Sequence, residues 1–168
     1  MIKCRGWDTA GTVAGHGLDP DYIVGVLLGI NPDNDIFYVL DVIRGRWSPG
    51  DVEKKIKLTA MCDGEKTRIY YPQAPGAAGR FEAYKMVGEL QGYMVSTERE
   101  IGDKADRADP FAAQCQHGYV KLLEASWNDA FVDELCAFPN AAHDDQVDAV
   151  CGAFRTLVRR PQYGWIAV

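Results

Sequence analysis

Residues 22–43 read YIVGVLLGINPDNDIFYVLDVI. Two apolar runs rich in β-branched and aromatic residues, Tyr22–Ile30 and Ile36–Ile43, flank a cluster of Asn, Pro and Asp at residues 31–35. Such runs joined by turn-forming residues predict a β-hairpin. The run Ile2–Asp8 predicts a further strand before the hairpin, so we expect three consecutive antiparallel strands.

The residues after the hairpin alternate between helical and β patterns. Ser48 and Pro49 predict the start of a helix, because serine is a favoured N-cap and proline suits the first helical position. Further helices are expected at about 77–91, 106–117, 127–138 and 143–160, and further strands at about 67–71, 92–97 and 119–124. A strand-rich start followed by this alternation predicts an α/β class. We expect a mixed β-sheet with helices on both faces, forming one domain over residues 1–168.

The composition is that of a folded protein. Hydrophobic residues make up 47% and charged residues 25% of the 168 residues, which excludes a disordered chain. No apolar run reaches the roughly 20 residues that a membrane helix needs, so we expect no association with a membrane.

The formal net charge is −6, the wrong sign for a protein that binds nucleic acid through bulk charge alone. Basic residues nevertheless gather locally. The clusters are Arg44 with Arg46; Lys54, Lys55 and Lys57; Lys104 with Arg107; and Arg155, Arg159 and Arg160. Such clusters suit a basic rim around an acidic centre, and they also suit an ordinary mixed surface.

Two features of the sequence concern the core. In the helix at 77–91, the apolar residues Phe81, Tyr84, Val87 and Leu90 fall on one face, which is typical of a face that packs on a sheet. The five cysteines are scattered and never spaced as C-x-x-C, which disfavours a zinc site and a disulfide framework and favours a reducing, intracellular setting. We expect them to be small buried core residues.

Carboxylates mark two places in the chain. Asp8 ends the first strand, at the kind of sheet edge where ligands commonly bind, although a turn-forming aspartate is the alternative. The sequence HDDQVDA at 143–149 places Asp144, Asp145 and Asp148 at a helix start, with Asp148 on the same side as the other two. Carboxylates at this density suit a hard divalent cation, although an N-cap aspartate with two solvated neighbours gives the same pattern.

Four motifs occur in order along the chain: RGWDTA at 5–10, YPQAPGAAGR at 71–80, GDKADRA at 102–108 and HDDQVDA at 143–149. Together they make the sequence resemble, over essentially its whole length, the C-terminal nuclease domain of the large terminase subunit of tailed bacteriophages. The resemblance implies an RNase H-like fold related to Holliday-junction resolvases, and an endonuclease that cuts double-stranded DNA during viral genome packaging. No G-x-x-x-x-G-K-[ST] sequence occurs, so we expect no ATPase domain in these residues.

The same resemblance implies a cofactor, partners and a location. The cofactor is a pair of Mg²⁺ or Mn²⁺ ions. The partners are double-stranded DNA, the terminase ATPase domain, the small terminase subunit and the portal protein. The location is the cytoplasm of the infected bacterial host.

Carried over motif by motif, the resemblance assigns catalytic and metal-binding roles to the acidic residues. Asp8 matches the ligand that bridges both ions. Asp145 matches the ligand of the C-terminal helix, with Asp148 as its partner. Asp144 competes with Asp145 for this role, and the sequence does not separate the two.

Basic residues near these motifs are candidates for contacts with DNA. Lys104 and Arg107 resemble the residues that the family places near the DNA backbone, and Arg80 is a further DNA-binding candidate. His143 is a candidate general base, and a packing histidine at a helix start is the alternative.

One position departs from the family pattern. The segment after the fourth strand usually supplies an acid, often as P-Q-D-P-G, whereas residues 72–76 read PQAPG with Ala74 at that place. Either another group substitutes, or the register is shifted, or Ala74, natural or engineered, disables the site; we favour a disabled or weakened site. Two other hypotheses stay open: a catalytically silent DNA-docking and assembly module, which Ala74 favours, and a junction-resolving endonuclease.

Overall fold

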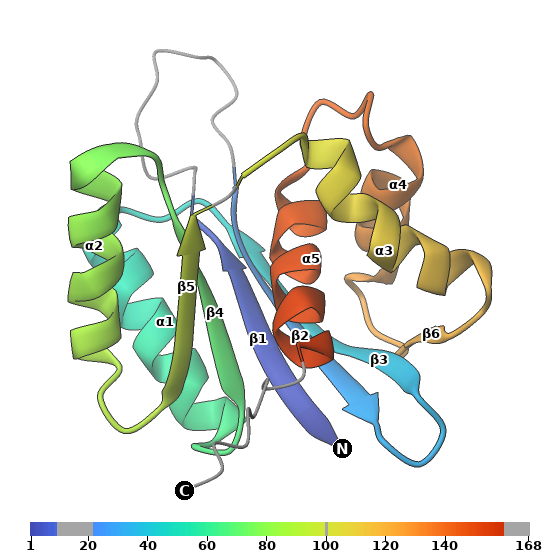
Figure 1. Ribbon diagram of the computed structural model, residues 1–168, viewed down its shortest axis with the longest axis horizontal. Helices are drawn as coiled ribbons and strands as arrows, with labels where there is room; N and C mark the ends of the chain where they lie inside the picture. Colours follow the sequence, from blue (N-terminus) through green and yellow to red (C-terminus); the bar gives the residue numbers. More distant parts are fainter. Residues whose placement is uncertain (10–21, 100, 160–168) are drawn as a thin grey trace, which may run out of the picture.

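The computed structural model describes residues 1–9, 22–99 and 101–159 (Figure 1). In chain order its elements are β1 (Ile2–Asp8), β2 (Ile23–Asn31), β3 (Ile36–Gly45), α1 (Pro49–Asp63), β4 (Arg68–Gln73), α2 (Gly76–Glu89), β5 (Met94–Arg99), α3 (Lys104–Gln116), β6 (Val120–Leu122), α4 (Asn128–Ala137) and α5 (Asp145–Val158). The hairpin and the alternation after it are confirmed. No helix in the described part of the chain is long and apolar enough to cross a membrane.

The described strands form a mixed sheet with the order β5-β4-β1-β2-β3-β6. β2 pairs antiparallel with β1 and with β3, so the antiparallel three-strand start is confirmed. β4 is parallel to β1, β5 is parallel to β4, and β6 is parallel to β3. Because β1, β4 and β5 run in the same direction, their carboxyl ends meet at one edge of the sheet (Figure 1).

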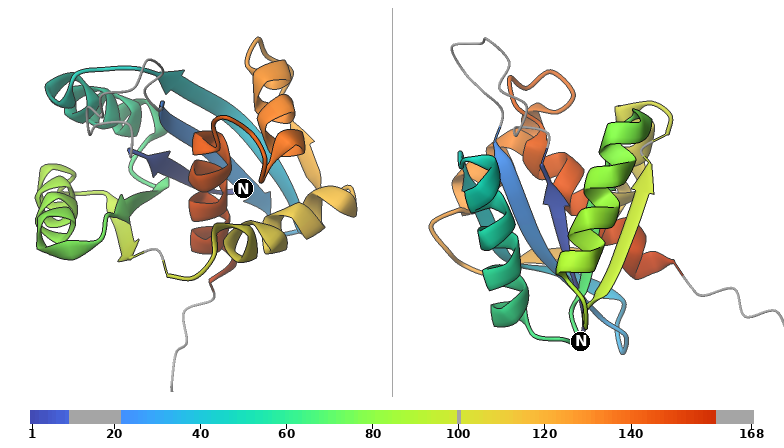
Figure 2. Two further views of the ribbon diagram at one scale, coloured as in Figure 1. Left: turned by 90° about the horizontal axis from the view of Figure 1, so that it is seen from above. Right: turned by 90° about the vertical axis from the view of Figure 1, so that its left-hand side faces the viewer.

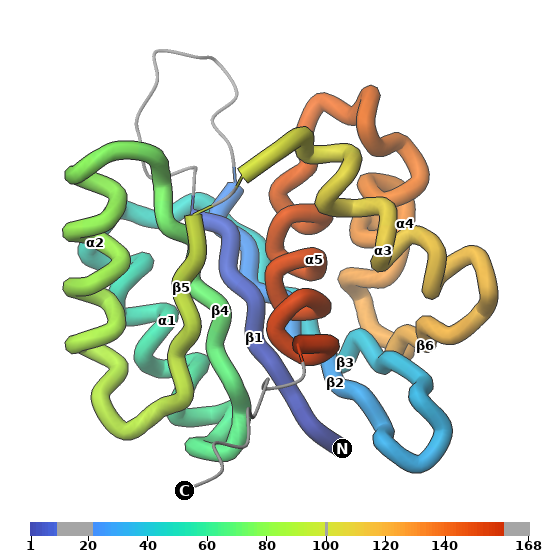
Figure 3. Tube along the Cα trace, viewed as in Figure 1, coloured from blue at the N-terminus to red at the C-terminus, as the bar shows by residue number. Residues whose placement is uncertain are grey.

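Helices cover both faces of the sheet, as the view from above in Figure 2 shows. α3, α4 and α5 pack on one face over a core that includes Val26, Phe37 and Phe154. α1 and α2 pack on the other face, over Trp7 and Ile69. The tube in Figure 3 shows α5 lying along β1 and β2, near the middle of the molecule.

The apolar face predicted for the second helix is correct only in part, because Leu90 is buried in the core beside Trp7 and Ile69 whereas two other members are exposed. Phe81 and Tyr84 are 74% and 65% exposed, whereas the small residues Gly79 and Ala83 are buried. A Cβ atom on Gly79 would lie only 2.3 Å from the carbonyl oxygen of Ala74. The helix therefore meets the end of β4 through small residues, which a search for large apolar residues at helical spacing does not find.

The cysteines are buried only in part. Cys4 and Cys151 are buried, but Cys62, Cys115 and Cys136 are exposed, so the expectation of a buried set is wrong for these three. Burial raises the pKa of the Cys4 and Cys151 thiols to about 12, so both stay protonated near neutral pH.

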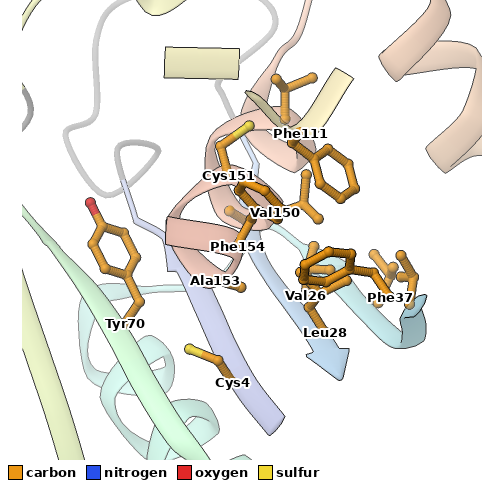
Figure 4. Packing of buried hydrophobic residues seen from close by; sticks show 14 of the residues in the cluster. Cys4, Val26, Leu28, Phe37, Tyr70, Phe111, Val150, Cys151, Ala153 and Phe154 are labelled. Carbon is orange, nitrogen blue, oxygen red and sulfur yellow. The ribbon is translucent and has the colours of Figure 1, made fainter. Parts of the chain in front are cut away.

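Glycine allows α5 to approach the sheet closely. A Cβ atom on Gly6 of β1 would lie 2.1 Å from the carbonyl oxygen of Ala149 in α5. On the helix side of this contact, a Cβ atom on Gly152 of α5 would lie 2.3 Å from the ring of Tyr70 in β4. Figure 4 shows the apolar packing around this contact, with Tyr70 on β4 and Ala153 on α5.

We predict that Gly6→Ala lowers the free energy of unfolding by about 1–3 kcal/mol or more, because the added methyl group overlaps a backbone oxygen that cannot move alone. Urea denaturation followed by circular dichroism measures this. The matched control is Gly88→Ala in α2, where a Cβ atom meets nothing within 4 Å. That control is expected to be neutral or to stabilise by up to about 1 kcal/mol. An equal effect of the two changes would contradict the close approach.

Candidate active site

The register between β1 and α5 brings Asp8 to the start of α5. The thiol of Cys4 hydrogen-bonds with Thr156, and Gly6 lies under Ala149, so the helix runs antiparallel to the strand. Two strand residues advance roughly 6.6 Å and four helical residues roughly 6 Å. Asp8 lies two strand residues beyond Gly6 and Asp145 lies four helical residues before Ala149, so this register places Asp8 near the first turn of α5, which begins at Asp145.

Asp8 and Asp145 are both buried, with exposed fractions of only 7% and 4%. Asp145 Oδ2 accepts a hydrogen bond of 3.1 Å from the backbone N–H of Tyr22, at the start of β2. His143 lies beside this carboxylate, with Nδ1 3.9 Å from Asp145 Oδ2, and its ring packs edge-on against Tyr22 with ring centroids 5.1 Å apart. Buried carboxylates are stable only when positive charge or hydrogen bonds compensate them, and the N–H of Tyr22 supplies one such bond to Asp145.

Asp144 and Asp148 are paired with a lysine. Lys104 Nζ lies 2.6 Å from Asp144 Oδ1 and 2.6 Å from Asp148 Oδ2. Arg107 Nη2 lies 3.4 Å from Asp148 Oδ1. Burial lowers the pKa of Lys104, but its hydrogen bonds with Asp144 and Asp148 outweigh burial and raise that pKa above the ordinary lysine value. The ammonium group is therefore charged at neutral pH.

Ala74 lies beside the same edge of the sheet. β1 and β4 pair in parallel, with Gly6 opposite Tyr70, so Asp8 is level with Pro72 and Ala74 follows directly after β4. Ala74 is an exposed residue. An acidic side chain at this position would thus stand at the carboxyl end of the strand next to Asp8.

The structure brings most of the predicted residues together. The first turn of α5 carries Asp145 and Asp148, with Asp144 as its N-cap, and Lys104 and Arg107 reach it from α3. Arg80 is exposed in α2, and in the described part of the chain no ion pair joins it to the acidic residues.

Sequence reasoning missed a buried carboxylate that holds the start of α5. Glu134 is 7% exposed, and its two carboxylate oxygens accept hydrogen bonds of 2.6 Å from the backbone N–H and the side-chain amide of Gln146. Asp144, the N-cap residue, makes no side-chain capping bond, so Glu134 performs that function from α4. Glutamate on a surface helix is usually solvated, and no signal in the sequence marks this one as buried.

The second missed group is a stack of basic and aromatic side chains next to Asp145. The guanidinium carbons of Arg44 and Arg46 lie 3.7 and 4.1 Å from the centroid of the Tyr22 ring. Arg44 Nη2 also lies 3.5 Å from Glu134 Oε2. The basic cluster at 44–46 therefore belongs to the surroundings of the acidic residues.

The carboxylates fit a divalent cation only in part. Among the residues that the structure describes, no group of three or more His, Cys, Asp or Glu side chains is placed to hold a metal ion. Asp8 and Asp145 supply the hard oxygen donors that Mg²⁺ and Mn²⁺ prefer. Asp144 and Asp148 do not fit a second ion as they stand, because the Lys104 ammonium lies between them.

An apolar cavity lies elsewhere on the molecule. It has a volume of about 420 Å³ between α3, α4, α5 and β6, and Phe111, Phe131 and Leu135 contribute to its lining. None of the four aspartates lines it, so it is separate from the candidate active site.

The sheet order, the helices on both faces and the carboxylates at the carboxyl end of β1 define an RNase H-like α/β protein. The family model described as the terminase RNaseH-like domain matches residues 5–156, and the chain belongs to that family. No curated protein matches the sequence.

Solved structures confirm the fold. The large terminase nuclease of the thermophilic phage G20c, crystallised with bound zinc, superposes with a TM-score of 0.66 at 19% identity, covering 92% of this chain and 80% of that one. The P22 large terminase nuclease domain gives a TM-score of 0.63 at 13% identity, covering 93% and 80%. The fowlpox virus resolvase in complex with Holliday junction DNA gives 0.56 at 8% identity, covering 94% and 100%.

We predict that Glu134→Gln lowers the free energy of unfolding by about 1.5–3 kcal/mol, because an amide in place of the carboxylate turns a donor toward the donors of Gln146. Thermal and urea denaturation measure the loss. The control is Glu65→Gln, an exposed residue between α1 and β4, which is expected to change stability by less than about 0.5 kcal/mol. A loss no larger than that of the control would contradict the capping role.

Proposed function

We propose that this chain is a metal-dependent endonuclease domain that cleaves double-stranded DNA during viral genome packaging. The observation that carries the proposal is that two buried carboxylates, Asp8 at the end of β1 and Asp145 at the start of α5, belong to elements whose backbones touch at Gly6 and Ala149. Membership of the terminase RNaseH-like family supports it.

The proposed cofactor is Mg²⁺ or Mn²⁺, with two ions in the complete site. Such ions supply a Lewis acid for the attacked phosphate and lower the pKa of the attacking water. The G20c terminase nuclease was crystallised with zinc and also with cobalt, which supports a site for divalent metal in this chain. Asp8 would hold both ions, with Asp145 and the pair Asp144 and Asp148 as the remaining acidic ligands.

The other residues of the site would position the substrate and move a proton. Arg44 and Arg46 stack on the ring of Tyr22, whose backbone N–H donates a hydrogen bond to Asp145. Together with Lys104 and Arg107 they surround the acidic residues with basic side chains. Such a surround suits the phosphates of DNA, whose contacts position the duplex without reading its bases. His143, next to Asp145, is the candidate general base.

The partners and the location follow from the same proposal. DNA packaging would require the terminase ATPase domain, the small terminase subunit and the portal protein, and it would take place in the cytoplasm of the infected bacterial host. The residues 1–168 would form one nuclease domain that works with an ATPase domain outside this sequence.

Ala74 supports two refinements. With no acid beside Asp8 on β4, one ion lacks a ligand, so we expect weak binding of that ion and slow cleavage. The second candidate function is a catalytically silent module that docks DNA or packaging proteins, and Ala74 is the observation that favours it. The likeness to the fowlpox resolvase keeps a junction-resolving endonuclease as a further alternative, which preference for four-way junctions over linear duplex would reveal.

We predict that Ala74→Asp raises the rate of plasmid cleavage in Mn²⁺ or Mg²⁺ at least about tenfold, equivalent to about 1.4 kcal/mol in the barrier, because it restores an acidic ligand. Agarose-gel assays of supercoiled plasmid measure the rate. The control is the double variant Asp8→Asn with Ala74→Asp, which is expected to lose the gained activity.

Two outcomes would change the proposal. If the unmodified chain cuts as fast as Ala74→Asp and Asp8→Asn abolishes cutting, the site is complete without position 74. If no variant cuts, the silent docking module becomes the better proposal.

A further inference from the structure

The ammonium group of Lys104 lies between Asp144 and Asp148 at the start of α5, where a divalent metal ion would have to bind to use both carboxylates. Lys104 Nζ is 2.6 Å from an oxygen of Asp144 and 2.6 Å from an oxygen of Asp148. Both are short charge-assisted hydrogen bonds, which are the strongest kind that a lysine makes. The two carboxylates are four residues apart on one helix side and would otherwise repel one another.

The fold places this ammonium group, because the lysine is at the start of a packed helix. Lys104 is the first residue of α3, whose N-cap Asp103 accepts a hydrogen bond of 2.8 Å from the backbone N–H of Ala105. α3 packs on α5 through Phe111, whose ring centroid is 5.6 Å from that of Phe154. The lysine therefore reaches the acidic residues from a fixed helix terminus.

Lys104 and the two aspartates that it contacts are also partly shielded from water. The side chain of Asp148 is 14% exposed, and those of Lys104 and Asp144 are 35% and 34% exposed. A second cation could reach Asp148 only by displacing an ammonium group that already satisfies one of its oxygens, while Arg107 lies 3.4 Å from the other.

We propose that Lys104 is a resident counter-cation of the acidic site, which fills the Asp144 and Asp148 pair so that the site takes one divalent ion readily, at Asp8 and Asp145. A second ion enters only when Lys104 moves away. This inference rests on the proposed function only in placing the first ion at Asp8 and Asp145; it changes the expected count of ions from two to one.

Manganese binding tests this inference without any reference to cleavage. Isothermal titration and electron paramagnetic resonance count the Mn²⁺ ions bound by the unmodified chain, by Lys104→Met, and by Lys66→Met as the control. Lys66 is an exposed lysine, so the control removes the same charge away from the site. We expect one tightly bound ion in the unmodified chain and in the control, and two in Lys104→Met. The second ion in that variant should bind at least about tenfold more tightly than in the unmodified chain.

Stability without metal is the second readout. With EDTA present, Lys104→Met should melt at a lower temperature than the unmodified chain and the control, because two carboxylates lose their counter-charge. Mn²⁺ should raise the melting temperature of Lys104→Met more than that of the other two proteins. If Lys104→Met is unfolded in EDTA, refolding on addition of Mn²⁺ together with a folded Lys104→Arg variant supports the proposal, and any other result overturns it.

Two results in folded proteins overturn the counter-cation role. One is an unmodified chain that binds two Mn²⁺ ions equally well, and the other is a Lys104→Met variant that matches the unmodified chain in ion count and melting temperature. Failure of the nuclease proposal is distinguishable: the binding results would then stand as expected while no variant cleaves DNA.

Discussion

The close contact between Gly6 of β1 and the backbone of α5 is the constraint on which the site depends. Since no side chain separates them, the antiparallel helix is held in one register on the strand. That register brings the end of β1 to the start of α5, and with it Asp8 to Asp145. A bulkier residue at position 6 would overlap the backbone of α5 and so move the helix outward, away from the strand that carries Asp8.

Burial of these carboxylates requires support from several elements. Tyr22 donates a backbone hydrogen bond to Asp145, and Glu134 holds the first turn of α5 through Gln146. Lys104 supplies positive charge from α3 to the neighbouring aspartates. These contacts give the acidic residues the hydrogen bonds and positive charge that burial requires.

Much of this architecture could be predicted from the sequence, because the strand and helix periods of the chain are strong. The hairpin at residues 22–43 and the mixed sheet required only local patterns and family motifs, whereas the shared metal site of Asp8 and the α5 aspartates stays a prediction from the family motifs. The features that the sequence did not predict depend on contacts between residues that are distant in the chain. The small-residue face of α2 and the burial of Glu134 follow from how helices meet neighbouring elements. The bond from Lys104 to Asp144 joins residues that are adjacent only in the fold, and no spacing rule reports it.

The most direct test of the central claim is a crystal structure grown with Mn²⁺ and analysed by anomalous scattering. The predicted result is a manganese peak bound jointly by carboxylate oxygens of Asp8 and Asp145, at roughly the 2.0–2.6 Å typical of hard divalent cations. A map in which the manganese lies elsewhere, or in which Asp8 and Asp145 do not share an ion, would contradict the claim that β1 and α5 together build a metal-dependent nuclease site.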